Sequence, residues 1–90
     1  MIEPITNQVR GAIYEAAWRA YCVTNSSEYA FSKAVEESGK HRIGAFQASE
    51  IARDACETVQ QEQRALNKTL LAETDGFVKR YLSRFANPRQ

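Results

Sequence analysis

Residues 49–71, SEIARDACETVQQEQRALNKTLL, decide the fold class of this 90-residue chain. Read as a helix, this stretch places its apolar side chains on one side at 3.6-residue spacing. These side chains are Ala52, Ala55, Cys56, Val59, Leu66 and Leu70. A polar ridge on another side changes from acidic to basic along the chain, which favours a helix because the charges oppose its macrodipole. We therefore predict a long helix over residues 47–73, with Ser49 as a candidate N-cap.

The helix predicted over residues 4–23 is apolar on two sides. An aliphatic stripe extends along one side from Ile5 to Val23, and aromatic rings occupy nearly the opposite side. A helix of this kind is either central in its own fold or shared with a partner.

Two shorter helices complete the prediction. One covers residues 27–38 and ends at Gly39, after a run of turn formers in which Asn25 and Glu28 have the spacing of a capping box. The other covers residues 75–85. Only an Asp-Gly step separates this last helix from the long one, so the alternative is a single continuous rod. The middle of the long helix is rich in glutamine, and we expect it to project past the core or lie on its surface.

The fold class is therefore all-α, a small bundle of three to four helices with a long third helix, in a single domain that spans residues 1–90. The net charge of +1 gives no whole-molecule reason to expect nucleic acid as a partner. We expect a cytoplasmic protein, because no apolar run approaches the length of a membrane span and the first residues do not resemble a signal peptide. Cys22 and Cys56 are expected to be reduced, with one disulfide between two helices as the alternative.

The side chains that catalysis or metal binding requires are sparse. His41 is the one histidine, and a di-metal bundle needs more histidines and carboxylates than this chain aligns. The acidic ridge of Glu50, Asp54 and Glu57 is interpreted as a solvated helix face. A cysteine nucleophile would need a base beside it, so an enzyme is favoured only if folding brings His41 next to a thiol. We expect no enzymatic activity, no cofactor and no metal.

The aromatic side of the first helix is the candidate partner-binding surface. Tyr14, Trp18 and Tyr21 recur at i, i+4 and i+7, and Arg10 precedes them by one turn. Tryptophan, tyrosine and arginine are the residues most enriched in interface hot spots. The alternative is that these rings complete the core of the protein itself. If they form an interface, Trp18→Ala is expected to weaken association by about 2 kcal/mol or more.

These features predict a small non-catalytic module that binds another protein, or a second copy of itself as a homodimer. It would act as an adaptor, regulator or inhibitor, a profile common among accessory proteins of phages and plasmids. The second hypothesis is a nucleic-acid-binding regulator that uses the basic turn at residues 40–42 and the basic C-terminal helix. Its candidate contacts are Lys33, Lys40, Arg42, Lys79, Arg80 and Arg84. Binding through phosphate contacts is expected to weaken steeply as the salt concentration rises, whereas binding through a hydrophobic aromatic interface is expected to change little.

The basic C-terminal segment also balances the acidic excess of residues 50–62. This balance predicts a contact between the two segments, either within one chain or between two subunits.

Overall fold

The computed structural model describes residues 6–66 and 73–85 of the chain. Within these ranges the chain forms four α-helices and no strand. The helices are α1 (Asn7–Thr24), α2 (Ser27–Ser38), α3 (Ala45–Leu66) and α4 (Thr74–Ser83). The predicted all-α bundle with a long third helix is confirmed, and the bounds of α2 are those predicted. Whether α3 and α4 are continuous depends on residues 67–72, which lie outside the described residues.

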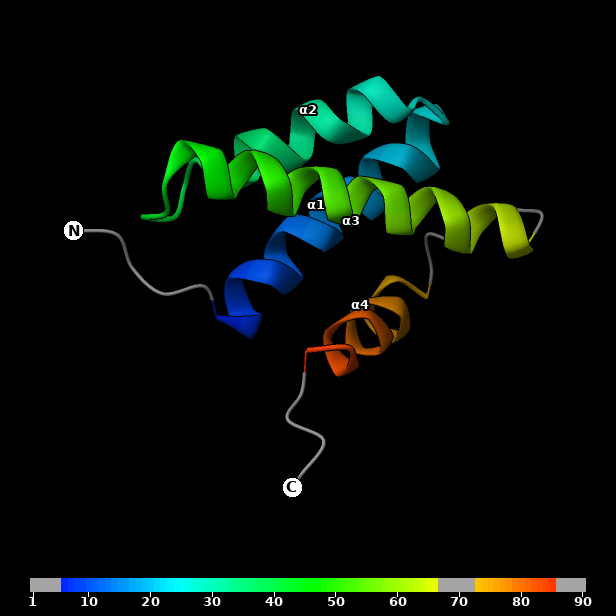
Figure 1. Cartoon of the computed structure of the whole chain (residues 1–90). Coiled ribbons are helices and arrows are strands. Elements are labelled where there is room, and N and C mark those ends of the chain that lie inside the picture. Colours follow the sequence, from blue (N-terminus) through cyan, green and yellow to red (C-terminus); the bar gives the residue numbers. More distant parts are fainter. Residues whose placement is uncertain (1–5, 67–72, 86–90) are drawn as a thin grey trace.

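α1 is the central helix of the bundle. α2 and α3 pack against it and against each other, and α4 packs against α1 on the side away from α2 (Figure 1). Both apolar sides of α1 are therefore used within the fold. Of the two alternatives that the sequence left for this helix, the structure shows a central place in its own fold.

The core differs in character on the two sides of α1. α2 buries only small side chains, Ala30, Ala34 and Ser38, which let its axis approach its neighbours closely. α4 instead buries the large rings of Phe77 and Tyr81. The bundle thus has an alanine-rich half under α2 and an aromatic half under α4.

The turn between α1 and α2 is closed by two adjacent residues. Asn25 has a left-handed conformation (φ 58°), and its backbone N–H donates to the carbonyl of Tyr21, so it ends α1. Ser26 begins α2, because its hydroxyl accepts a hydrogen bond from the backbone N–H of Tyr29 at 3.1 Å. The predicted capping box at Asn25 is therefore wrong by one residue. Asparagine tolerates the left-handed region, and this use competed with its capping role.

The other helix starts also differ from the predictions. Thr6 caps α1 by accepting from the N–H of Val9 at 3.2 Å, and the predicted start at Pro4 lies outside the described residues. α3 begins at Ala45, so Ser49 lies inside the helix and does not cap it. The predicted end of this helix at residue 73 also falls beyond the described part of α3.

The glutamine-rich middle of α3 is only partly at the surface. Glu57, Gln61 and Arg64 are exposed, as predicted, but Gln63 is 3% exposed. Its amide Nε2 donates to the Sγ of Cys22 on α1 at 3.0 Å, which draws this face of α3 into the core. Both cysteines are free thiols. None of the described helices is long and apolar enough to cross a membrane.

Candidate interaction surface

The aromatic side of α1 lies inside the protein. Tyr14 is 1% exposed and Trp18 is 0% exposed. The ring of Tyr14 stacks on Tyr81 with centroids 4.2 Å apart, and the ring of Trp18 stacks on Phe77 at 4.4 Å. Tyr21 is half-buried and packs against the same core. The alternative interpretation, in which these rings complete the core, describes the structure.

Of the residues predicted to bind a partner, Tyr14 and Trp18 therefore belong to the core, whereas Arg10 and Tyr21 are half-buried. Arg10 also turns inward, with its guanidinium 4.1 Å from the ring centroid of Phe85, just beyond α4. The rings of Tyr14 and Trp18 are buried because α4 supplies a stacking partner for each, Tyr81 and Phe77. Burial raises the pKa of Tyr14 and of its stacking partner on α4 well above the ordinary tyrosine value.

Two of the basic candidates around α2 lie beside carboxylates. Lys33 Nζ lies 3.0 Å from Glu36 Oε1, and Lys40 Nζ lies 3.4 Å from Glu37 Oε1. Arg42 is exposed in the connection to α3. Lys33 and Lys40 thus each have a carboxylate beside them.

The basic residues of α4 face the acidic side of α3. Arg80 Nη1 lies 3.7 Å from Glu62 Oε1. Arg84, directly after α4, donates from Nη1 to the hydroxyl of Thr58 at 3.1 Å. The predicted contact between the basic C-terminal segment and the acidic helix is therefore present within one chain. Lys79 is exposed. Since α2 and α4 lie on different sides of α1, the six basic candidates do not form a single surface (Figure 1).

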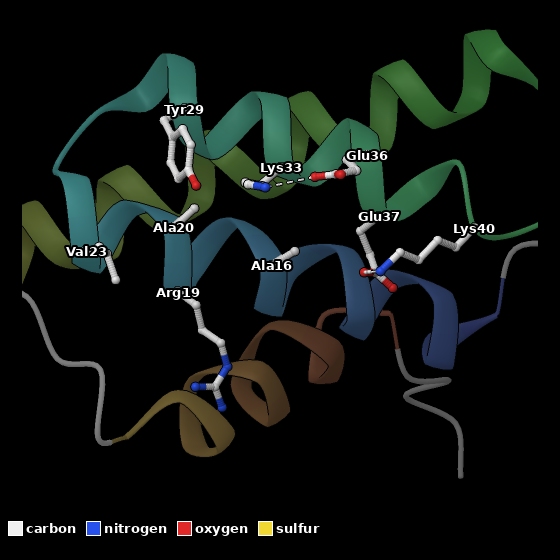
Figure 2. A pocket seen from close by; sticks show the side chains of 9 residues that line it. All are labelled: Ala16, Arg19, Ala20, Val23, Tyr29, Lys33, Glu36, Glu37 and Lys40. Carbon is white, nitrogen blue, oxygen red and sulfur yellow. Dashed lines mark hydrogen bonds and ion pairs between the residues drawn. The ribbon is translucent and has the colours of Figure 1, made fainter.

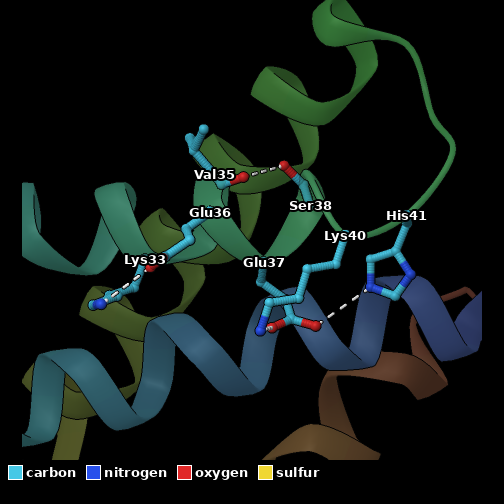
Figure 3. Close-up of polar contacts among 7 residues, drawn as sticks. All are labelled: Lys33, Val35, Glu36, Glu37, Ser38, Lys40 and His41. Carbon is cyan, nitrogen blue, oxygen red and sulfur yellow. Dashed lines mark hydrogen bonds and ion pairs between the residues drawn. The ribbon is translucent and has the colours of Figure 1, made fainter.

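The arrangement that would favour an enzyme is not formed among the described residues. His41 Nε2 lies 3.4 Å from Glu37 Oε2, as Figure 3 shows, while Cys22 contacts Gln63. The thiol of Cys56 is buried and donates to a backbone carbonyl, and burial raises its pKa, which opposes a nucleophilic role. In residues 6–66 and 73–85 no group of three or more His, Cys, Asp or Glu side chains could hold a metal ion.

A groove of about 460 Å³ lies between α1 and α2 (Figure 2). Ala16 and Ala20 of α1 form its floor, and longer side chains of both helices surround them. The lining consists of Ala16, Arg19, Ala20, Val23, Tyr29, Lys33, Glu36, Glu37 and Lys40. Small residues at the bottom and long ones at the edge give the groove an apolar floor and a charged rim.

The groove is bordered by apolar side chains that the fold leaves in water. Val23, near the end of α1, is 74% exposed, and Tyr29, in the first turn of α2, is 43% exposed. In the sequence, Val23 ends the aliphatic stripe of the first helix, and the apolar spacing over residues 27–38 fits either Tyr29 or Ala30 on the inward side. The structure buries Ala30 and leaves Tyr29 partly exposed, with its ring directed from α2 toward Ala20 at the edge of the groove (Figure 2). The ambiguity between Tyr29 and Ala30 was the one feature of the sequence that pointed to this groove.

The charged rim of the groove is a small network on α2. Lys33 Nζ lies 5.5 Å above the ring centroid of Tyr29 as well as beside Glu36. The hydrogen bond with Glu36 raises the pKa of Lys33, and the same bond lowers the pKa of Glu36. Figure 3 places Glu37 between Lys40 and His41. Because the side chains of Lys33 and Glu36 are 41% and 63% exposed, their pair contributes little to stability and remains accessible to a partner.

No protein-family model, curated protein or solved structure matches this chain. We therefore infer the kind of partner from the residues that line the groove.

Proposed function

We propose that this protein is a small non-catalytic protein-binding module, acting as an adaptor, regulator or inhibitor, and that its contact surface is the α1/α2 groove. The observation that supports this proposal is the exposure of Val23 and Tyr29 beside the alanine floor. Protein interfaces combine an apolar centre with a polar rim and favour tyrosine at anchor positions. A helix of a partner fits such a groove, because small floor residues let it approach closely.

The mixed charges of the rim favour a protein partner over nucleic acid. Lys33 and Lys40 lie beside Glu36 and Glu37, and these carboxylates would repel a phosphate backbone. A protein surface can instead present both signs to match them. Nucleic-acid binding by the basic residues stays a prediction, and its expected signature is affinity that falls steeply with salt concentration.

The test is photo-crosslinking from position 29 in cells that express the protein. Tyr29 is replaced by a benzophenone amino acid, and the matched control carries the same group at Lys79, which is exposed on α4 away from the groove. The proposal expects one or a few defined protein adducts from position 29 that are absent from position 79. Each adduct is identified by mass spectrometry, and its purified partner should bind the wild-type protein more tightly than a Tyr29→Glu variant.

Either of two results contradicts this function. The first is the absence of any protein adduct specific to position 29. The second is a purified partner whose affinity is the same for the wild type and for Tyr29→Glu.

A further inference from the structure

Four of the groove residues form one stripe along α2. They are Tyr29, Lys33, Glu36 and Lys40. Their spacing of i, i+4, i+7 and i+11 places them on a single side of a helix. Gly39, directly after the last residue of α2, keeps right-handed helical angles (φ −68°, ψ −14°), so Lys40 continues the stripe.

This stripe is complementary to itself in the reverse direction. The midpoint between Lys33 and Glu36 is also the midpoint between Tyr29 and Lys40. When two copies of α2 lie antiparallel about a two-fold axis at this point, Lys33 faces Glu36 of the second copy and Tyr29 faces Lys40 of the second copy. At 1.5 Å rise per residue, the two inner side chains each lie about 2 Å along the helix from the axis. Both are long enough to meet across it.

We propose that the partner of the α1/α2 groove is a second copy of this chain, in a two-fold dimer with the two α2 helices antiparallel. The inference rests on the proposed function and specifies its partner. A two-fold interface uses the same patch on both subunits and must therefore be self-complementary. The stripe meets this condition with two Lys33–Glu36 ion pairs and two Tyr29–Lys40 cation–π contacts.

The remaining groove residues agree with a second copy. The groove carries both signs of charge, with Arg19, Lys33 and Lys40 beside Glu36 and Glu37, so a partner of one charge sign would be repelled by part of the rim. A second copy presents charges of both signs along the same groove, and its Lys33 and Glu36 can pair with Glu36 and Lys33 of the first copy.

The inference is tested by sedimentation equilibrium from about 1 µM to 1 mM, a range that covers weak protein–protein association. The samples are the wild type, Lys33→Glu, Glu36→Lys and an equimolar mixture of the two variants. Each single reversal places like charges opposite one another twice per dimer, and the dissociation constant is expected to rise about tenfold. In the mixture a carboxylate faces an ammonium again at both places, so a mixed dimer should form about as tightly as the wild type.

A matched control and a double variant keep the test specific. Lys79→Glu makes the same charge change outside the groove and is expected to change the dissociation constant less than twofold. The double variant Lys33→Glu/Glu36→Lys restores opposite charges within one sequence and should again form a homodimer. Circular dichroism verifies that each variant is folded, which is expected because neither Lys33 nor Glu36 is buried in the core.

Three results overturn the inference. They are a wild-type monomer up to about 1 mM, a dimer that the single reversals leave intact, and a mixture that associates no better than either variant alone. A wild-type monomer that still gives a foreign protein adduct from position 29 would overturn the second copy as partner while leaving the proposed function standing. A monomer without any adduct specific to that position would contradict both.

Discussion

Tyr81→Phe removes one oxygen atom from the contact between α4 and the rest of the bundle. The hydroxyl of Tyr81 donates a 2.7 Å hydrogen bond to Asp54 Oδ2 on α3. Its ring is 2% exposed, stacks on Tyr14 at 4.2 Å and meets the ring of Phe85 edge-on at 5.3 Å. Phenylalanine keeps these ring contacts. The substitution therefore isolates the hydrogen bond that joins α4 to α3.

The expected loss follows from the charge and exposure of the acceptor. A hydrogen bond to a charged group contributes about 1.5–3 kcal/mol to stability. Asp54 is half-buried, so water can hydrate its carboxylate in the variant. We therefore expect the free energy of unfolding to fall by about 1.5–2 kcal/mol, the lower part of that range. For a domain of this size the melting temperature should fall by about 6–16 °C.

Guanidinium unfolding measures this loss with two signals. Circular dichroism reports the helices, and Trp18 fluorescence reports the docking of α4, because Trp18 stacks on Phe77. The control is Tyr21→Phe, which removes a hydroxyl that has no hydrogen bond within the described residues and should cost less than about 0.5 kcal/mol. A Tyr81→Phe variant as stable as this control would refute the role assigned to the hydrogen bond.

Three further predictions concern the core. Trp18→Ala should lower the free energy of unfolding by about 3–5 kcal/mol, measured by chemical denaturation, because it empties a fully buried site; an unchanged midpoint would contradict this. Above about pH 10, unfolded tyrosines lose protons that buried Tyr14 and Tyr81 keep, so stability should fall by up to about 2.7 kcal/mol per pH unit. Tyr81→Phe should flatten that slope in alkaline melts, and an equal slope would contradict the assignment. Gln63→Leu should raise the free energy of unfolding by about 1 kcal/mol in thermal melts, because the buried Oε1 of Gln63 has no hydrogen-bond partner among the described residues. A variant less stable than the wild type would contradict this.

The helix pattern could be predicted from sequence because it depends on local spacing. The apolar period of α3, the two-sided apolar character of α1 and the bounds of α2 are all properties of neighbouring residues. The helix ends were predicted less well. Asn25 and Ser26 are both turn and cap formers, and only the backbone geometry decides which ends one helix and which begins the next.

The α1/α2 groove could not be predicted from sequence, because its position depends on which helix covers which face. Trp18 has the spacing of either an interface anchor or a core ring, and its partner Phe77 lies far along the chain. On α2, Tyr29 and Ala30 differ by one residue, or about 100° of rotation around the helix. That rotation decides whether a tyrosine or an alanine faces solvent. Only the packing of α2 on α1 and α3 fixes it.

The most direct test of the central claim is an NMR dilution series of the ¹⁵N-labelled protein. The claim is that the α1/α2 groove, and not the aromatic side of α1, is the contact surface for a second copy. Concentration-dependent shifts should cluster at Ala16, Ala20, Tyr29, Lys33 and Glu36, while the indole signal of Trp18 stays constant. Shifts centred on α4 and Trp18, or a spectrum independent of concentration, would contradict the account.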